Sequence, residues 1–180
     1  SDRTQIYIWQ NILKDLHSKV GSVIPLEFVL RVFAGAIKIN VELKDRGCAL
    51  VLHKFLEKVL SAGVWSSEFI GKNIIVSSFI LDEVAIFKNL YPWVETAWIR
   101  NYWQFLLTTK SRICEDLSFF HLDSIHLNYR IVSQEIVSSF KSRGFKVRVY
   151  TVNDPDLLKK CLEWGVDGVF TDKAEEFLKA

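Results

Sequence analysis

Methionine is absent from this sequence of 180 residues, which begins with Ser1. Apolar residues make up 49% of the chain, and a core of that size ordinarily contains a few methionines, which fill gaps between other side chains. We therefore expect that the sequence is part of a longer protein, or that residues are missing from it.

Long apolar runs and clusters of one charge are absent as well. No run approaches the roughly 18 residues that a transmembrane helix needs. The 23 basic and 21 acidic residues give a formal charge of +2 and are interspersed, whereas nucleic-acid binding usually requires a basic patch. We expect a soluble domain with no transmembrane segment and no nucleic-acid partner.

The three cysteines, Cys48, Cys114 and Cys161, lie far apart and form no CxxC pair. This spacing argues against a zinc site or a disulfide framework and favours buried, reduced thiols. Reduced thiols are in turn weakly indicative of a cytoplasmic protein.

Segments with strand and helix periodicity alternate along the chain. The predicted strands are 36–44, 73–79, 95–102, 123–127, 146–152 and 167–172. The predicted helices are 48–60, 81–90, 104–117, 131–143, 155–164 and 173–180. Strands that are separated by helices indicate right-handed βαβ units and a parallel sheet.

A parallel sheet of this kind is either open and doubly wound or closed into a barrel. Neither GxGxxG nor GxxxxGK[ST] occurs in the sequence, so the phosphate loops typical of open nucleotide-binding sheets are absent. Polar residues instead stand at the carboxyl ends of several predicted strands, and Glu42, Lys44 and Tyr150 are among them. That distribution favours a barrel, in which the ends of many strands contribute to one site.

Five segments, taken in order, resemble the glycerophosphodiester phosphodiesterase family. "INVELK" is similar to the family's strand with Glu-x-Lys, and "IIVSSF" to its next strand, which ends in Ser-Phe. "VYTVND" and "GVDGVFTD" are similar to its closing Trp-Thr-Val-Asn and Gly-Val-Asp-Gly-x-x-Thr-Asp blocks, and "VIPLEFVL" to its Ile-Pro-x-Leu-Glu-x-x-Leu segment. Each segment alone is weak evidence for the resemblance. Together the five segments occur in the family's order and cover the chain from end to end, which makes the resemblance strong.

The resemblance implies an α/β fold, a (β/α)8 TIM-type barrel of which this sequence covers about six βα units. It also implies metal-dependent hydrolysis of glycerophosphodiesters to glycerol 3-phosphate and an alcohol, with Ca²⁺ or Mg²⁺ as the divalent cation. Glu42 matches the position of a metal-ligating Glu, and Lys44 matches a catalytic lysine that points at the phosphate. Tyr150 stands where the family usually has Trp, near the glycerol of the substrate, so it keeps an aromatic wall and adds a hydroxyl.

Each of these residues also has a purely structural interpretation. Glu42 and Lys44 would then form an ion pair that fills the barrel or lies at a solvated strand end, and Tyr150 would be an ordinary packed aromatic. Thr171 and Asp172 fit a site wall and local loop bonding equally well.

Two further groups of residues are expected to be structural. Asn153 and Asp154 are predicted to form a turn and a helix cap. The four histidines, His17, His53, His121 and His126, are predicted to be surface imidazoles or imidazoles with satisfied hydrogen bonds.

The family's two acid/base histidines stand in an N-terminal His-Arg-Gly block and a His-Asp block, and its further metal carboxylates in Glu-x-Asp. None of these blocks occurs here, and a barrel usually needs about 250 residues. We therefore expect residues 1–180 to be a single, incomplete barrel domain that lacks its first strands.

Three functional interpretations remain open from the sequence. The first is an active phosphodiesterase whose partner is a small-molecule glycerophosphodiester. The second is a non-catalytic phosphate-binding or interaction module derived from the same barrel. The third is an unrelated parallel α/β protein. The sequence does not decide the alcohol released, the choice between Ca²⁺ and Mg²⁺, or the oligomeric state.

Overall fold

The computed structural model describes residues 24–177. They contain a six-stranded sheet in which every neighbouring pair is parallel and the strands follow one another in chain order. The strands are β1 (Ile39–Leu43), β2 (Ile74–Ser78), β3 (Glu95–Arg100), β4 (Ser124–Asn128), β5 (Lys146–Tyr150) and β6 (Gly168–Val169). All six predicted strands are thus confirmed, although most are shorter than predicted.

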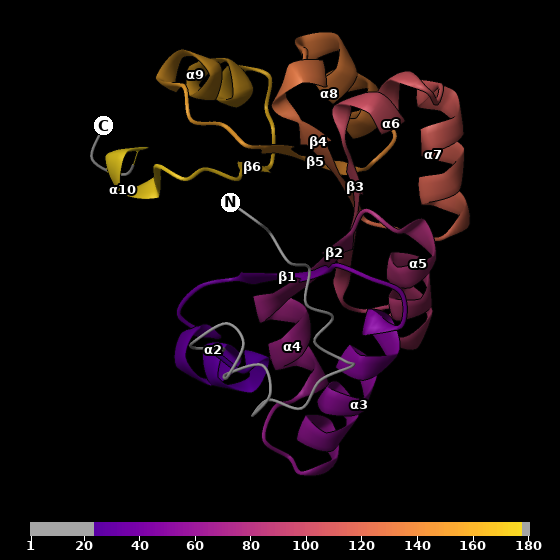
Figure 1. The fold of residues 1–180 in the computed structure, drawn as a ribbon, viewed down its shortest axis with the longest axis vertical. Helices are drawn as coiled ribbons and strands as arrows, with labels where there is room; N and C mark the ends of the chain where they lie inside the picture. The colour runs from indigo at the N-terminus through magenta and orange to yellow at the C-terminus, as the bar shows by residue number, and fades with distance from the viewer. Residues whose placement is uncertain (1–23, 178–180) are drawn as a thin grey trace, which may run out of the picture.

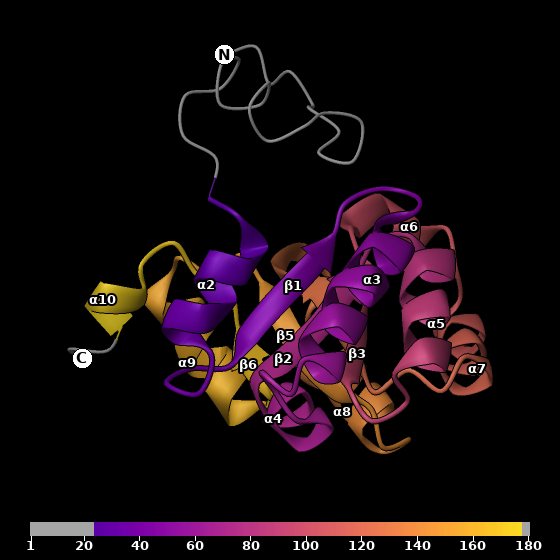
Figure 2. The ribbon, with the colours of Figure 1, turned by 90° about the horizontal axis from the view of Figure 1, so that it is seen from below.

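Most helices connect successive strands and lie outside the curve of the sheet, whereas α2 precedes the first strand and α10 follows the last (Figures 1 and 2). They are α2 (Leu26–Phe33), α3 (Cys48–Ser61), α4 (Ser67–Asn73), α5 (Leu81–Leu90), α6 (Tyr102–Leu106), α7 (Lys110–Phe119), the 3-10 turn η2 (Tyr129–Ile131), α8 (Gln134–Lys141), α9 (Pro155–Glu163) and α10 (Ala174–Phe177). The sheet with its helices forms a half-barrel of about six βα units. This confirms the predicted fold class.

The two faces of the sheet differ in chemistry because successive side chains of a strand point to opposite sides. Val76, Leu127 and Val147 face the helices and belong to the two main hydrophobic clusters. Asn40 and His126 lie on the inner face. The apolar face therefore anchors the helices, and the inner face is left for polar side chains.

Side-chain caps explain most differences between predicted and observed helices. The predicted helix 104–117 is two helices, because Thr109 begins α7 by accepting a hydrogen bond from the backbone NH of Arg112. Ser133 likewise caps α8, so the helix predicted from residue 131 begins later. Helix α4, capped by Ser66, was not predicted. In each case a short hydroxyl side chain satisfies a backbone NH and sets the start of the helix.

All three cysteines are free thiols, and the predicted burial holds for two of them. Cys114 and Cys161 are buried and Cys48 is half-buried. Between residues 24 and 177 no helix combines the length and the apolar character that crossing a bilayer requires.

Candidate active site

A cavity of about 190 Å³ opens at the carboxyl ends of the strands. Its walls come from β1, β3, β4 and β5 and from residues that follow β2, β5 and β6: Asn40, Glu42, Phe79, Ile99, His126, Tyr150, Thr151 and Phe170. Enzymes built on (β/α)8 barrels place their active sites at this end. We therefore treat the cavity as the candidate active site.

Glu42 and Lys44 lie together at the carboxyl end of β1, as predicted. The Lys44 Nζ is 2.6 Å from the Glu42 Oε1, and the Lys44 side chain is 74% exposed whereas that of Glu42 is 26% exposed. The angles of the contact are not those of a hydrogen bond, so Oε1 is buried with no hydrogen-bond partner among the residues described. Glu42 thus lines the cavity, and Lys44 presents an ammonium to solvent beside it.

Tyr150 forms part of the cavity wall. Its hydroxyl donates a hydrogen bond to the backbone oxygen of Arg100 (3.0 Å), and its ring lies edge-on to that of Phe79 with centroids 6.1 Å apart. Burial, with the charge of Glu42 as a smaller cause, raises the pKa of Tyr150 to about 12. Tyr150 therefore stays protonated at neutral pH and provides an aromatic surface rather than an acid or base.

Of the two interpretations of Thr171 and Asp172, the structure shows the loop bonding. Asn153 Oδ1 accepts from the Thr171 hydroxyl (3.1 Å) and from the backbone NH of Asp172 (2.9 Å). Its Nδ2 donates to Asp172 Oδ2 (2.8 Å). These bonds join the segment after β5 to the segment after β6, and neither Thr171 nor Asp172 lines the cavity. Asp154 caps α9, as predicted.

The prediction for His126 was wrong. This histidine is on β4, is 1% exposed and lines the cavity. Neither ring nitrogen has a hydrogen-bond partner within residues 24–177. In the segment "DSIHLN" Ser124, His126 and Asn128 alternate with Ile125 and Leu127. That period of two could have placed His126 on the inner face of the sheet.

The other histidines lie away from the cavity. His53 agrees with the prediction, since its Nδ1 is 3.0 Å from the Tyr91 hydroxyl and its Nε2 is 3.3 Å from a Glu57 oxygen. His121 is exposed in a turn after α7. His17 lies outside the described residues.

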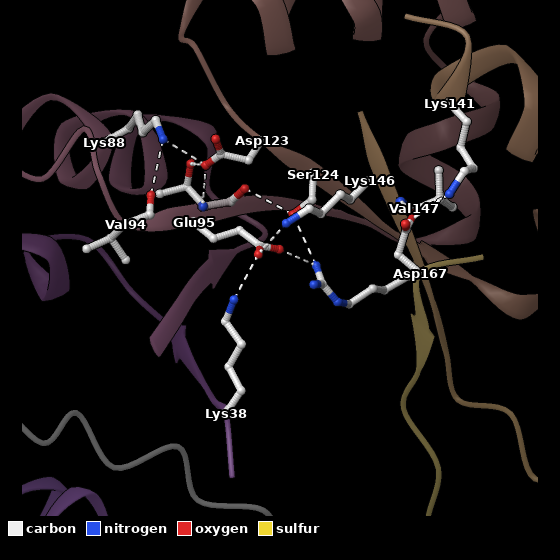
Figure 3. Close-up of polar contacts among 12 residues, drawn as sticks. Lys38, Lys88, Val94, Glu95, Asp123, Ser124, Lys141, Lys146, Val147 and Asp167 are labelled. Atoms are coloured by element: carbon white, nitrogen blue, oxygen red, sulfur yellow. Dashed lines mark hydrogen bonds and ion pairs between the residues drawn. The ribbon is translucent and has the colours of Figure 1, made fainter. Parts of the chain in front are cut away.

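A larger cavity of about 460 Å³ lies at the amino ends of the strands. There the Glu95 carboxylate pairs with three cations, Lys38 at 3.1 Å, Lys146 at 2.8 Å and Arg148 at 2.7 Å (Figure 3). Close by, Asp123 pairs with Lys88 at 2.8 Å. Four cations and two carboxylates are thus joined in ion pairs at the end of the barrel that contributes to stability. We therefore assign this cavity a structural role.

The described residues supply only part of what a divalent cation needs. Glu42 Oε1 and Asn40 Oδ1 are buried oxygens without a hydrogen-bond partner among the described residues, and oxygen is the donor that Ca²⁺ and Mg²⁺ prefer. Within residues 24–177, however, no group of three or more His, Cys, Asp or Glu residues could hold a metal ion. These oxygen atoms are therefore suitable ligands for Ca²⁺ or Mg²⁺, but the described residues supply too few of them to hold the ion.

A comparison with protein families decides the relationship. The model of the glycerophosphoryl diester phosphodiesterase family matches residues 9–176. The chain belongs to this family. The resemblance seen in the sequence motifs is therefore confirmed.

Family members of known structure or assigned function are similar to the chain over most of its length. A Bacillus subtilis glycerophosphodiester phosphodiesterase is 26% identical over 166 residues, which are 89% of this chain and 55% of that protein. The crystal structure of the Thermotoga maritima glycerophosphodiester phosphodiesterase has a TM-score of 0.70 and 25% identity, and the match covers 93% of this chain and 67% of that one.

An Oleispira antarctica phosphodiesterase, solved in complex with its product sn-glycerol 3-phosphate, shares the fold. Its TM-score is 0.57 with 22% identity, over 79% of this chain and 54% of that one. The chain thus spans between about half and two thirds of the length of these relatives.

Proposed function

We propose that this chain is part of a phosphodiesterase that hydrolyses glycerophosphodiesters to glycerol 3-phosphate and an alcohol. The observation that carries the proposal is the pairing of Glu42, whose Oε1 is buried, with an exposed Lys44 ammonium at the carboxyl end of β1. A phosphodiester is an anion whose transition state concentrates charge on its oxygens, and such charge is stabilised by a fixed cation at the site. Membership of the family supports the same reaction.

We assign three roles to residues of the candidate active site. Lys44, exposed at the rim, stabilises the charge of the phosphate. Glu42 provides an oxygen ligand to a divalent cation, Ca²⁺ or Mg²⁺, which when bound would neutralise charge on the phosphate oxygens. Tyr150 packs its ring against the substrate as part of the wall.

The site needs groups that the described residues do not supply. The described residues lack a full set of cation ligands, and the one histidine that lines the cavity is buried and neutral. We therefore propose that further cation ligands and the acid/base groups lie outside residues 24–177. This agrees with a single barrel domain of which the sequence contains about two thirds of the length of the Thermotoga relative.

The proposal is tested by the release of glycerol 3-phosphate from glycerophosphocholine by the full-length protein, with and without EDTA. We expect turnover that EDTA abolishes and that added Ca²⁺ or Mg²⁺ restores. Glu42→Gln should raise the cation concentration needed for half-maximal activity at least 10-fold, since it replaces an anionic oxygen ligand with a neutral amide oxygen. Glu176→Gln is a matched control, because Glu176 is exposed and, among residues 24–177, pairs only with Lys173 at 3.6 Å.

Two results would contradict this function. Turnover that is insensitive to EDTA would exclude the role of the cation. Binding of glycerol 3-phosphate without any turnover would instead support a non-catalytic phosphate-binding module.

A further inference from the structure

Three side chains of the cavity carry buried polar atoms without hydrogen-bond partners. Within the described part of the chain these atoms are both ring nitrogens of His126, Oδ1 of Asn40 and Oε1 of Glu42, of which the last lies 2.6 Å from the Lys44 ammonium. Proteins satisfy the great majority of buried polar groups, because each unsatisfied group costs roughly 1–3 kcal/mol. Since all three side chains line one cavity, the shared explanation is a polar ligand that occupies it.

Among the described residues no lysine or arginine lines the cavity, so its inner part offers an anion no cationic group to bind. His126 is neutral at physiological pH, because burial, with the charge of Arg148 as a second cause and that of Glu95 in opposition, lowers its pKa to about 3. A neutral imidazole has one NH donor and one acceptor nitrogen. Asn40 donates from Nδ2 to the Ser77 hydroxyl (3.0 Å), which leaves its Oδ1 as a further acceptor.

A hydroxyl group matches this arrangement, because it donates one hydrogen bond and accepts others. The cavity volume of about 190 Å³ corresponds to roughly six molecules of liquid water and suits a small polyol. Phe170, whose ring centroid is 5.0 Å from that of His126, offers an apolar surface for carbon atoms. The cationic Lys44 at the rim and the neutral acceptors within would orient such a ligand with its phosphate outward and its hydroxyls inward.

We propose that His126, together with Oδ1 of Asn40, binds the hydroxyl groups at the glycerol end of the substrate and thereby selects glycerol esters over other phosphodiesters. The choice of ligand rests on the proposed function. The geometry of the cavity, by contrast, is independent of whether the bound molecule is hydrolysed.

Calorimetric titration of the full-length protein in a Ca²⁺ buffer tests this inference through binding alone. The probes are sn-glycerol 3-phosphate and n-propyl phosphate, which has the same carbon chain and phosphate but lacks both hydroxyls. We expect the protein to bind sn-glycerol 3-phosphate roughly 10- to 100-fold more tightly than n-propyl phosphate, because the complex with n-propyl phosphate lacks the buried hydrogen bonds to the hydroxyls. Equal affinities would overturn the proposal.

Variants then test whether His126 is responsible for the difference in affinity between the two probes. His126→Leu should abolish the difference between the two probes by weakening only glycerol 3-phosphate, and His126→Gln, which keeps a donor and an acceptor, should retain part of it. His53→Gln is the matched control and should bind as the unmodified protein does, since His53 bonds to Tyr91 and Glu57 outside the cavity. Full discrimination in His126→Leu would contradict the assignment.

A measurement on the unmodified protein covers the case in which His126→Leu does not fold. In a ¹H–¹⁵N spectrum of the imidazole rings, the His126 nitrogens should shift on addition of sn-glycerol 3-phosphate and not of n-propyl phosphate. A His126 signal that responds to neither probe would mean that only water occupies the cavity and would overturn the inference. Discrimination without hydrolysis of glycerophosphocholine would leave the inference standing and reject the proposed function.

Discussion

The Nζ of Lys44 lies 2.6 Å from the Oε1 of Glu42, yet the lysine is 74% exposed and the glutamate oxygen is buried. An exposed ion pair contributes little to stability, because water competes for both charges. A cation fixed at the mouth of a cavity can nevertheless contribute strongly to the binding of an anionic transition state. We therefore predict that the pair matters for activity more than for folding.

Lys44→Met tests that distinction. We expect kcat for glycerophosphocholine to fall about 10²- to 10³-fold, the loss typical of removing one group that stabilises transition-state charge, while the free energy of unfolding stays unchanged. Lys173→Met is the control, since Lys173 is a half-exposed lysine paired with Glu176. A stability loss in Lys44→Met without loss of turnover would show that the pair is structural.

Tyr150 gives a prediction about the wall of the cavity. Tyr150→Phe keeps the aromatic surface and removes the hydrogen bond to the Arg100 oxygen, so we expect a loss of about 1 kcal/mol in stability and little change in kcat. Tyr150→Ala should raise KM about 10-fold, since it removes the ring. Because the pKa of Tyr150 is about 12, the pH–rate profiles of the native protein and Tyr150→Phe should coincide up to pH 10. An alkaline limb that only the native protein shows would contradict a passive wall.

The sequence predicted the strands well because each has an apolar face that the helices bury. Alternation in "INVELK" placed Glu42 and Lys44 at one strand end, and the structure confirms that they meet. Local pattern could not predict contacts between distant segments. The bond from Tyr150 to Arg100 joins residues 50 positions apart, and Asn153 and Asp172 are brought together only when β5 and β6 pair.

His126 illustrates a different kind of error. Its spacing from other histidines suits no metal site, and a structural role was inferred for that reason. A single buried histidine can also bind a ligand by hydrogen bonds, and the alternation of "DSIHLN" would have indicated the inner face. What the sequence could not show is that both ring nitrogens lack a partner among the described residues, because that depends on every strand around the cavity.

Lys88 and Asp123 provide a test of the opposite end of the barrel. The Lys88 side chain is 8% exposed and its Nζ donates to Asp123 Oδ2 (2.8 Å) and to the Val94 oxygen (3.1 Å). Asp123→Ala should lower the free energy of unfolding by about 3 kcal/mol, since it leaves a buried ammonium without its counter-ion. Combining it with Lys88→Met should recover part of this loss in urea denaturation. Additive losses in the double variant would show that the two residues do not interact.

Glu95 makes stability depend on pH in a predictable direction. Burial alone would raise the pKa of this carboxyl, but the hydrogen bond from Lys146, the ion pair with Arg148 and the hydrogen bond from Lys38 lower it from 4.5 to about 2. A group whose pKa is lower in the folded chain stabilises the fold above its ordinary pKa and loses that contribution as the pH falls. The contribution of Glu95 should therefore be complete above about pH 5 and decrease between pH 4.5 and 2.

Glu95→Gln removes this dependence. At pH 7 we expect its free energy of unfolding to be about 3 kcal/mol lower, the lower end of the range for breaking a buried ion pair, because Lys38 and Lys146 are 40% and 50% exposed and can be hydrated instead. The difference between the two proteins should shrink as the pH falls from 4.5 towards 2 in urea denaturation series. Glu176→Gln, at an exposed site, should follow the native curve throughout. Parallel curves for Glu95→Gln and the native protein would mean that the three cations do not lower the pKa of Glu95. The network at the amino ends of the strands would then stabilise the barrel by packing alone.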